Sequence, residues 1–231
     1  MRVFSSRHAR LILLCVLLFV ISSVLASAGA AESRDALWNI VSTCTDLHAP
    51  HYCDNCSAPR VDSPCGQGRA CKETTEVWEE TTDYVAIRDR KMCGCEAGFV
   101  HGLAIPRTRV IGIEDPNRPD NIWSFAWAAA KKRISNEAEI ALAVNPASTR
   151  GQDQLHVHIV RLQPDARGRF DDSRSARVSS FGDIWSAAAK KAALLGLKDY
   201  GVLVTKQAEG DFIVLVGEKS PEKAFTQGEC R

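Results

Sequence analysis

Cysteine placement constrains this chain more than any other feature of its sequence. Eight of the nine cysteines follow residue 31, and six of these fall between Cys53 and Cys95. In an exported chain, an even number of cysteines is typical of disulfide bonds. We therefore expect a disulfide-rich N-terminal third, with Cys230 tied back to Cys44. The eight residues are Cys44, Cys53, Cys56, Cys65, Cys71, Cys93, Cys95 and Cys230.

The first 31 residues predict that the chain is exported. The first ten residues contain three arginines and no acid, residues 11–25 are an apolar run, and the small residues ASAGAA follow. This order is typical of a cleaved signal peptide. Residues 11–31 carry no charge. About 20 uncharged residues are enough to span a bilayer, so a retained membrane anchor is the alternative. Residues 32–231 are then expected to form one catalytic domain.

A zinc site is the alternative reading of part of the cysteine pattern. In the segment HAPHYCDNC, two histidines and two cysteines stand at metal-ligand spacings, and Cys93 with Cys95 could complete the set. An oxidising compartment favours disulfides over zinc. The four residues of the segment are His48, His51, Cys53 and Cys56.

The charge balance argues against nucleic acid as a partner. Without the three leader arginines, the formal charge of +1 becomes −2. Proteins that bind nucleic acid through bulk electrostatics carry a basic excess, which this chain lacks.

The hydrophobic pattern predicts an α+β fold with an antiparallel sheet of about five strands and two main helices. The two helices are expected from residue 120 or 121 to about 134 and over 182–197, and a shorter one over 33–43. The segments 139–145 and 155–162 should pair across a polar loop, and 200–206 should form a hairpin with 211–217. The other strands are expected at 83–89 and 99–106, and residues 165–180 are expected to be exposed.

Two histidines lie in the most informative segment, QLHVHIV at 154–160. Alternation along a strand places Gln154, His156 and His158 on one face, whereas the apolar residues between them face the core. This face could simply be solvated. It could also bind a metal, although only Asp153 offers a nearby third ligand. We favour a third reading, in which one imidazole is a nucleophile at phosphorus, because neutral imidazole is nucleophilic near pH 7. The preceding loop, 148–152, offers donors for phosphate oxygens.

The same residues resemble a known family. QLHVHIV is similar to the His-φ-His-φ-His-φ-φ motif of the histidine-triad superfamily, where φ is apolar. The wider chain resembles one branch, the bacterial CDP-diacylglycerol pyrophosphatases, also known as CDP-diacylglycerol phosphatidylhydrolases. Apart from the N-terminal export segment, the resemblance covers most of the chain from about Tyr84 to Cys230. The features there are GLAIPRTRVIGIEDP followed by NIWSFAWAAA, LAVN with Arg150 and Gln152 before the histidine strand, QPDA after it, and YGVLVTKQAEGDFIVLV with a final cysteine.

The resemblance implies a fold, a reaction and a site. The fold would be histidine-triad-like, and the reaction would be hydrolysis of the CDP-diacylglycerol diphosphate to CMP and phosphatidate. His156 would attack the α-phosphorus and form a nucleotidyl-histidine intermediate, and no metal or other cofactor is required. His156 and His158 would be the catalytic residues. The substrate would be bound by Gln154, Asn145, Arg150 and Gln152. The protein would act in the periplasm or at the periplasmic face of the cytoplasmic membrane, where it meets a lipid-linked nucleotide.

One departure from the motif keeps other functions open. The first triad position is Gln154 rather than histidine. An amide can still donate a hydrogen bond to a phosphate oxygen, so hydrolysis should survive. The alternatives are a periplasmic nucleotide pyrophosphatase acting on small dinucleotides or nucleotide sugars, and a non-catalytic, disulfide-stapled binding protein. We expect His101, in the strand at 99–106, to be structural.

Overall fold

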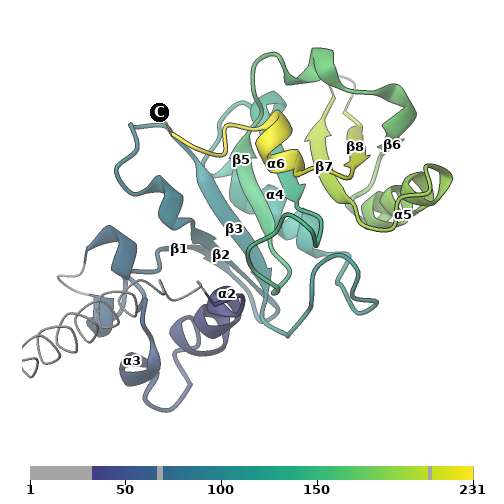
Figure 1. Ribbon diagram of the computed structural model, residues 1–231. Helices are drawn as coiled ribbons and strands as arrows, with labels where there is room; N and C mark the ends of the chain where they lie inside the picture. The colour runs from purple at the N-terminus through teal and green to yellow at the C-terminus, as the bar shows by residue number, and fades with distance from the viewer. Residues whose placement is uncertain (1–32, 67–69, 208–209, 231) are drawn as a thin grey trace, which may run out of the picture. The chain divides into compact units, whose positions relative to one another are not determined.

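The predicted strands form one antiparallel sheet in the computed structural model (Figure 1). The structure describes residues 33–66, 70–207 and 210–230, and the elements given below belong to the compact unit Arg34–Arg231. The predicted leader, residues 1–31, lies outside the described residues. Within the ranges described, no helix is both long enough and apolar enough to cross a bilayer.

The sheet has eight strands in the order β1-β2-β3-β5-β4-β7-β8-β6, and every neighbouring pair is antiparallel. Both pairings predicted from the sequence are confirmed, because β4 pairs with β5 and β7 with β8. The strands are β1 (Val77–Glu80), β2 (Tyr84–Arg88), β3 (His101–Pro106), β4 (Ile140–Val144), β5 (Val157–Arg161), β6 (Ser175–Val178), β7 (Gly201–Lys206) and β8 (Phe212–Gly217).

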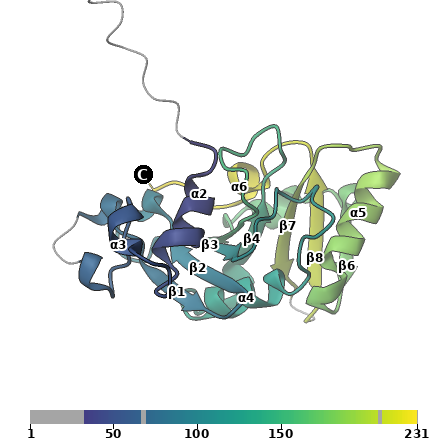
Figure 2. The same ribbon diagram turned by 90° about the horizontal axis from the view of Figure 1, so that it is seen from below.

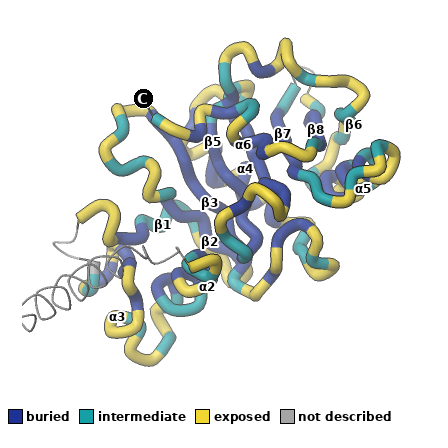
Figure 3. The backbone as a smooth tube through the Cα atoms, viewed as in Figure 1, coloured by how far each residue is buried: buried dark blue, intermediate teal, exposed yellow. Residues whose placement is uncertain are grey.

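The α+β class is confirmed, and the six segments expected as strands all form strands, but the predicted number of about five is too low. The strands β1 and β6 form the two edges of the sheet, and neither was predicted. Each has four residues, of which three are half-buried and one is exposed. An edge strand with no buried face lacks the apolar alternation by which strands are recognised in a sequence. The central strands, in contrast, are buried almost throughout (Figure 3).

Two longer helices, α4 (Ile122–Lys131) and α5 (Ile184–Leu194), confirm the predicted pair. They pack on the sheet face that carries Val157 and Ile159 of β5, and they share one apolar cluster with these residues. Trp123 of α4 is fully buried, with its ring centroid 4.7 Å from that of Trp185 of α5. This packing fixes which way the strands face, so the alternate positions of β5 must point to the opposite side.

That opposite face is covered in two places by short helices, which lie on the other side of the sheet from α4 (Figure 2). The helix α2 (Ala36–Asn39) continues into a π-helix, η1 (Ile40–Cys44), over β2 and β3. The helix α6 (Pro221–Phe225) approaches β4 and β7. This approach needs a glycine, because a Cβ at Gly201 would lie 2.6 Å from Pro221 Cδ. The remaining helices are α3 (Tyr52–Asn55) and the 3₁₀ turns η2 (Pro64–Gly66), η3 (Cys71–Glu73), η4 (Arg90–Met92), η5 (Glu137–Glu139), η6 (Ala166–Arg169), η7 (Asp172–Arg174) and η8 (Phe181–Asp183).

Four disulfides join the eight predicted cysteines, and three of them lie within residues 44–93. The pairs are Cys44–Cys56, Cys53–Cys65, Cys71–Cys93 and Cys95–Cys230. The expected bond between Cys230 and Cys44 was therefore wrong. The final residues run past the start of β3, next to the turn that holds Cys95, whereas Cys44 ends η1 beside α3. The alternative zinc reading also fails, because Cys53, Cys56, Cys93 and Cys95 are all disulfide-bonded.

Candidate active site

The two histidines of the QLHVHIV segment lie on the sheet face between the two short-helix clusters. His158 is in β5, and His156 immediately precedes that strand. Both are nearly buried, with 8% of His156 and 5% of His158 exposed. The two rings meet edge to face, with centroids 4.8 Å apart. Because both imidazoles are buried, they do not form a solvated strand face. Each buried ring nitrogen is therefore expected to have a hydrogen-bond partner or a chemical role.

The ring of His156 is held by one hydrogen bond to its own chain. Its Nδ1 lies 2.8 Å from the carbonyl oxygen of Gln154. A carbonyl oxygen only accepts, so Nδ1 carries the proton and, in the neutral ring, Nε2 carries the lone pair. Among the described residues, no other group is hydrogen-bonded to this ring. Burial lowers the pKa of His156, which keeps the ring neutral and Nε2 available at neutral pH.

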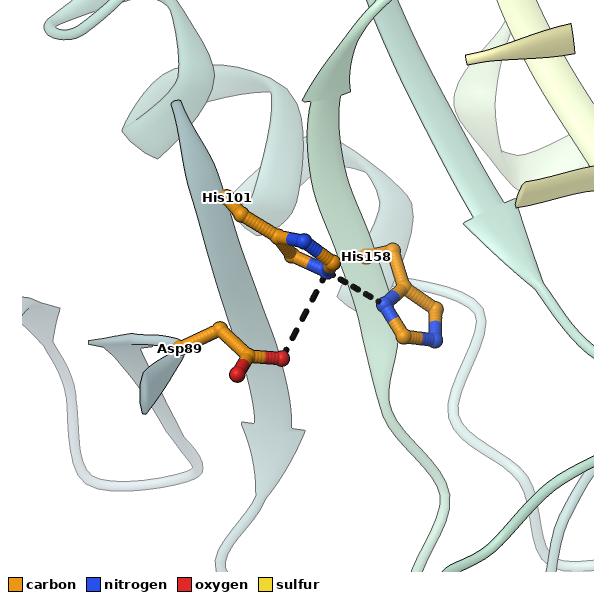
Figure 4. A group of neighbouring side chains, drawn as sticks. All are labelled: Asp89, His101 and His158. Atoms are coloured by element: carbon orange, nitrogen blue, oxygen red, sulfur yellow. Dashed lines mark hydrogen bonds and ion pairs between the residues drawn. The ribbon is translucent and has the colours of Figure 1, made fainter. Parts of the chain in front are cut away.

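A chain of hydrogen bonds, which we name the relay, fixes His158. Gly228 O accepts from His101 Nδ1 at 2.9 Å. His101 Nε2 must then accept from His158 Nδ1, 3.0 Å away (Figure 4). His158 Nε2 accepts in turn from Asn145 Nδ2 at 3.2 Å. Because the carbonyl of Gly228 cannot donate, one backbone oxygen sets the tautomers of both neutral rings. Burial lowers the pKa of His101, and it lowers that of His158 further, in keeping with this neutral arrangement.

The ion pair between Lys91 and Glu222 lies next to the relay. Glu222, in α6, accepts from Asn145 Nδ2 at 2.7 Å and from Lys91 Nζ at 2.8 Å. Its Oε2 also lies 3.3 Å from His158 Nε2. Burial alone would raise the pKa of Glu222, but the hydrogen bond and the positive charge of Lys91 act against burial, and the pKa is lowered to about 2. Ser220 donates to Asn145 Oδ1 at 2.7 Å, so both ends of that amide are engaged.

Three of these side chains have the geometry of a possible metal site. Ligand atoms of Asp89, His101 and His158 lie within 4.8 Å of one another, the one such group among the described residues. Asp89 Oδ2 is 3.5 Å from His101 Nε2 (Figure 4). An ion bound through His101 Nε2 and His158 Nδ1 would have to displace the proton between the two rings. Asp153, the third ligand considered from the sequence, is bound instead by Arg34.

Of the four predicted substrate-binding residues, the structure brings only Asn145 into the relay. Gln154 is fully buried, and its Nε2 donates to Pro106 O at 3.1 Å and to Thr108 O at 2.8 Å. Its Oε1 accepts from Val110 N at 3.3 Å. Both amide hydrogens are therefore in use, and a donor role toward phosphate remains a prediction that requires one of these bonds to break.

The other two predicted residues brace the loop before β5. Arg150 forms a bidentate pair with Glu114, with Nη1 2.8 Å from Oε2. Gln152 accepts from Leu37 N at 3.0 Å, which ties the loop to α2. As the structure stands, both side chains hold the loop that positions His156, and their contacts to substrate remain predictions.

A cavity of about 810 Å³ lies beside the histidine cluster, since Glu222 and Gly228 line part of it. The other charged residues in its wall are Glu96, Asp165, Lys223 and Glu229. Four carboxylates and one ammonium group disfavour a diphosphate in this cavity. It is therefore better suited to a neutral or cationic group than to the reacting phosphates.

Sequence reasoning missed the supporting half of the site. It predicted a structural role for His101 and gave no role to Lys91, Glu222 or Gly228. The last two lie in GEKSPEKAFTQGEC, a polar stretch of the kind usually found on a solvated surface. Their one available signal is the Ser220-Pro221 pair, a typical helix start, which predicts α6 but not the face that α6 presents.

Comparisons with known proteins match this chain to one named family. Residues 32–200 match a family model described as CDP-diacylglycerol pyrophosphatase. A Mycobacterium leprae protein named "Probable CDP-diacylglycerol pyrophosphatase" is 32% identical over 145 residues, which are 58% of this chain and 46% of the relative. A Yersinia pestis CDP-diacylglycerol pyrophosphatase is 27% identical over 173 residues, 71% of this chain and 58% of the relative.

A third relative matches a shorter segment. The CDP-diacylglycerol pyrophosphatase of Mycobacterium bovis BCG is 42% identical over 72 residues, 27% of this chain and 28% of the relative. The chain thus spans about half the length, or less, of these curated relatives. The family match nevertheless covers more than half of this chain and includes both histidines of QLHVHIV. The chain therefore belongs to the CDP-diacylglycerol pyrophosphatase family.

Proposed function

We propose that this chain hydrolyses the diphosphate of CDP-diacylglycerol to CMP and phosphatidate, with His156 as the nucleophile. The observation that carries the proposal is the hydrogen bond from His156 Nδ1 to the carbonyl of Gln154. It fixes the tautomer in which Nε2 is an unprotonated nucleophile, and burial keeps the ring neutral. Family membership supplies the substrate class.

The reaction takes two displacements at one phosphorus. His156 Nε2 attacks the α-phosphorus, a P–N bond forms, and the bond to the bridging oxygen breaks, so that phosphatidate leaves with that oxygen. Water then attacks the same phosphorus, the P–N bond breaks, and CMP leaves as water gives up a proton. This is a nucleotidyl-histidine route of the histidine-triad kind.

His158 acts next to the nucleophile. In the relay tautomer its Nε2 accepts from Asn145, so donation to a phosphoryl oxygen requires a proton on that atom. The Glu222 carboxylate, 3.3 Å away, would favour that proton as negative charge builds up on the phosphate. The hydrogen bond from Asn145 Nδ2 to His158 Nε2 would then have to break, whereas the bond from the same amide to Glu222 could remain.

The proposed setting is the periplasm or the periplasmic face of the cytoplasmic membrane. The charge pattern of the first 31 residues supports export, with either a cleaved signal peptide or a membrane anchor. An exported enzyme would meet its lipid-linked substrate at the membrane surface.

Release of CMP tests the function directly. Wild type and His156→Asn are each given CDP-diacylglycerol in detergent micelles and a water-soluble CDP ester. The exposed His51 supplies the matched control, His51→Asn. We expect CMP from the lipid substrate with wild type and control, and a loss of at least about 1,000-fold with His156→Asn, since a nucleophile is removed.

A trapping experiment identifies the nucleophile. Substrate labelled at the α-phosphate should label wild type in an alkaline quench and leave His156→Asn unlabelled. Turnover of the soluble ester alone would favour a small-nucleotide pyrophosphatase. Negligible turnover of both substrates, in wild type and variant alike, would favour a non-catalytic binding protein.

A further inference from the structure

The Cys95–Cys230 disulfide is distinctive because both of its ends lead into the relay. Gly228, whose carbonyl sets the tautomers of both rings, is two residues before Cys230. On the other side, Cys95 follows Lys91 by four residues, and Lys91 holds Glu222. The family match ends at residue 200, so this C-terminal arrangement lies beyond the segment that the family model covers.

The Lys91 side is a short hydrogen-bonded turn. Cys93 N donates to Arg90 O at 3.0 Å, and Cys95 N donates to Met92 O at 3.2 Å. Cys95 Sγ lies 3.0 Å from Lys91 O. The sulfur of Cys95 therefore packs against the backbone of Lys91, in a turn that the Cys71–Cys93 disulfide also anchors.

The tail, residues 226–230, is held on both sides of Gly228. Before Gly228, Gln227 N donates to Arg161 O at 2.8 Å. After Gly228, the disulfide is the covalent anchor. Gly228 also packs closely on the ion pair, because a Cβ at this position would lie 3.1 Å from Glu222 Oε1. Release of the second anchor would leave the carbonyl of Gly228 held from one direction.

We propose that the Cys95–Cys230 disulfide is a positioning element of the active site, which holds Gly228 O against His101 and Lys91 against Glu222. The tautomer and ring position of His158 depend on it through the relay. The inference rests on the proposed function for its effect on turnover, but its structural claim concerns only the histidine rings.

Paired double variants test the inference. Cys95→Ser/Cys230→Ser is compared with Cys53→Ser/Cys65→Ser, which removes the bridge between α3 and η2. The readouts are kcat and KM for CDP-diacylglycerol, and the ¹⁵N shifts of the ring nitrogens, which report the tautomer. For the first variant we expect kcat to fall about 10-fold with KM nearly unchanged, the size typical of losing an outer-shell partner. The His101 signal should show a mixture of tautomers, and the control should retain both wild-type properties.

A second pair keeps all disulfides intact. Gly228→Ala places a methyl group against Glu222, whereas Gly217→Ala meets nothing within 4 Å. We expect only Gly228→Ala to lower kcat and to shift the ring signals. If the cysteine variant does not fold, this pair still tests whether the position of the tail sets the rings, and unchanged ring signals in Gly228→Ala would overturn the inference.

The outcomes separate the two proposals. Wild-type ring shifts in Cys95→Ser/Cys230→Ser would overturn the inference, and so would equal losses of kcat in both cysteine variants. If wild type itself releases no CMP, the proposed function fails, and the ¹⁵N shifts alone decide whether the disulfide positions the rings.

Discussion

Lys91 and Glu222 form an ion pair of 2.8 Å beneath the histidines, although 131 residues separate them in the chain. Burial alone would lower the pKa of Lys91, but its bond to Glu222 raises it, so the ammonium stays charged. The pair keeps a carboxylate within 3.3 Å of His158. The site thus places the three buried neutral imidazoles of His101, His156 and His158 next to a carboxylate that is paired with an ammonium group.

The first prediction concerns that charge. Glu222→Gln keeps an acceptor for Asn145 but removes the charge next to His158. We expect kcat for CMP release to fall about 10- to 100-fold with little change in KM, because the residue acts through other groups. The exposed Glu218 provides the control, Glu218→Gln, which should keep wild-type kcat.

A double-variant cycle checks the same pair. Lys91→Met should cost less than Glu222→Gln, and the two changes together should cost less than the sum of the two losses in log kcat. Strictly additive losses would show that the pair does not act as a unit.

The second prediction is a pH dependence of stability. Burial lowers the pKa of His101, His156 and His158 below 6.5 in the folded protein. Below pH 6.5 the unfolded chain therefore binds more protons than the folded one, so the free energy of unfolding falls as pH falls. Each ring that stays neutral should contribute about 1.4 kcal/mol per pH unit in this window. The lowered pKa of Glu222, about 2, places its effect at more acidic pH.

Urea unfolding at pH 5, 6, 7 and 8 measures this slope. We expect the free energy of unfolding to be nearly constant from pH 7 to 8 and to drop between pH 6.5 and 5. His156→Asn should reduce the drop, and the exposed-site variant His51→Asn should leave it in place. A flat profile from pH 5 to 7 would contradict the buried neutral rings.

The third prediction separates two roles for Gln154. Gln154→Ala removes the partners of Val110 N, Pro106 O and Thr108 O. We expect a loss of about 2–4 kcal/mol in the free energy of unfolding, because buried polar groups lose their hydrogen bonds. The folded fraction should retain kcat within a few-fold.

Chemical denaturation and kcat measured on the same preparation distinguish the roles, with the half-buried Gln207→Ala as the control. A large loss of kcat with unchanged stability would instead assign Gln154 to the substrate, as the motif resemblance predicts.

The fourth prediction is that a chelator leaves the reaction intact. His101 Nε2 and His158 Nδ1 already share a proton in a 3.0 Å hydrogen bond. Dialysis against EDTA should therefore leave kcat unchanged, and added Zn²⁺ should inhibit by competing for these nitrogens together with Asp89. Loss of activity in EDTA that Zn²⁺ restores would show that the three side chains hold a required ion.

The sequence was sufficient for the part of the site that lies in one segment. Strand alternation placed His156 and His158 correctly, because apolar residues at 157 and 159 leave little choice of face. The two main helices were equally readable, since their buried residues recur at helical spacing. The role of His156 remains a prediction that the experiments above address.

The rest depends on tertiary contacts that no local pattern encodes. Glu222 and Lys91 look like ordinary surface charges, and only the approach of α6 over Gly201 brings one to the other. The wrong partner for Cys230 has the same origin. Cysteine spacing shows that bridges exist, but the choice among Cys44, Cys95 and the others depends on where the tail runs.

Three of the disulfides close short loops, with sequence separations of 12, 12 and 22 residues, whereas Cys95 and Cys230 are 135 residues apart. A nascent chain delivered N-terminus first thus exposes Cys95 as an unpaired thiol while His156 and His158 are already present. Glu222 and Gly228 arrive only near residue 230, so oxidation of this last thiol coincides with completion of the site. A chain in which Cys95 is still reactive toward alkylating agents is, on this account, one whose histidine site is still incomplete, and thiol labelling provides a measure of its maturation.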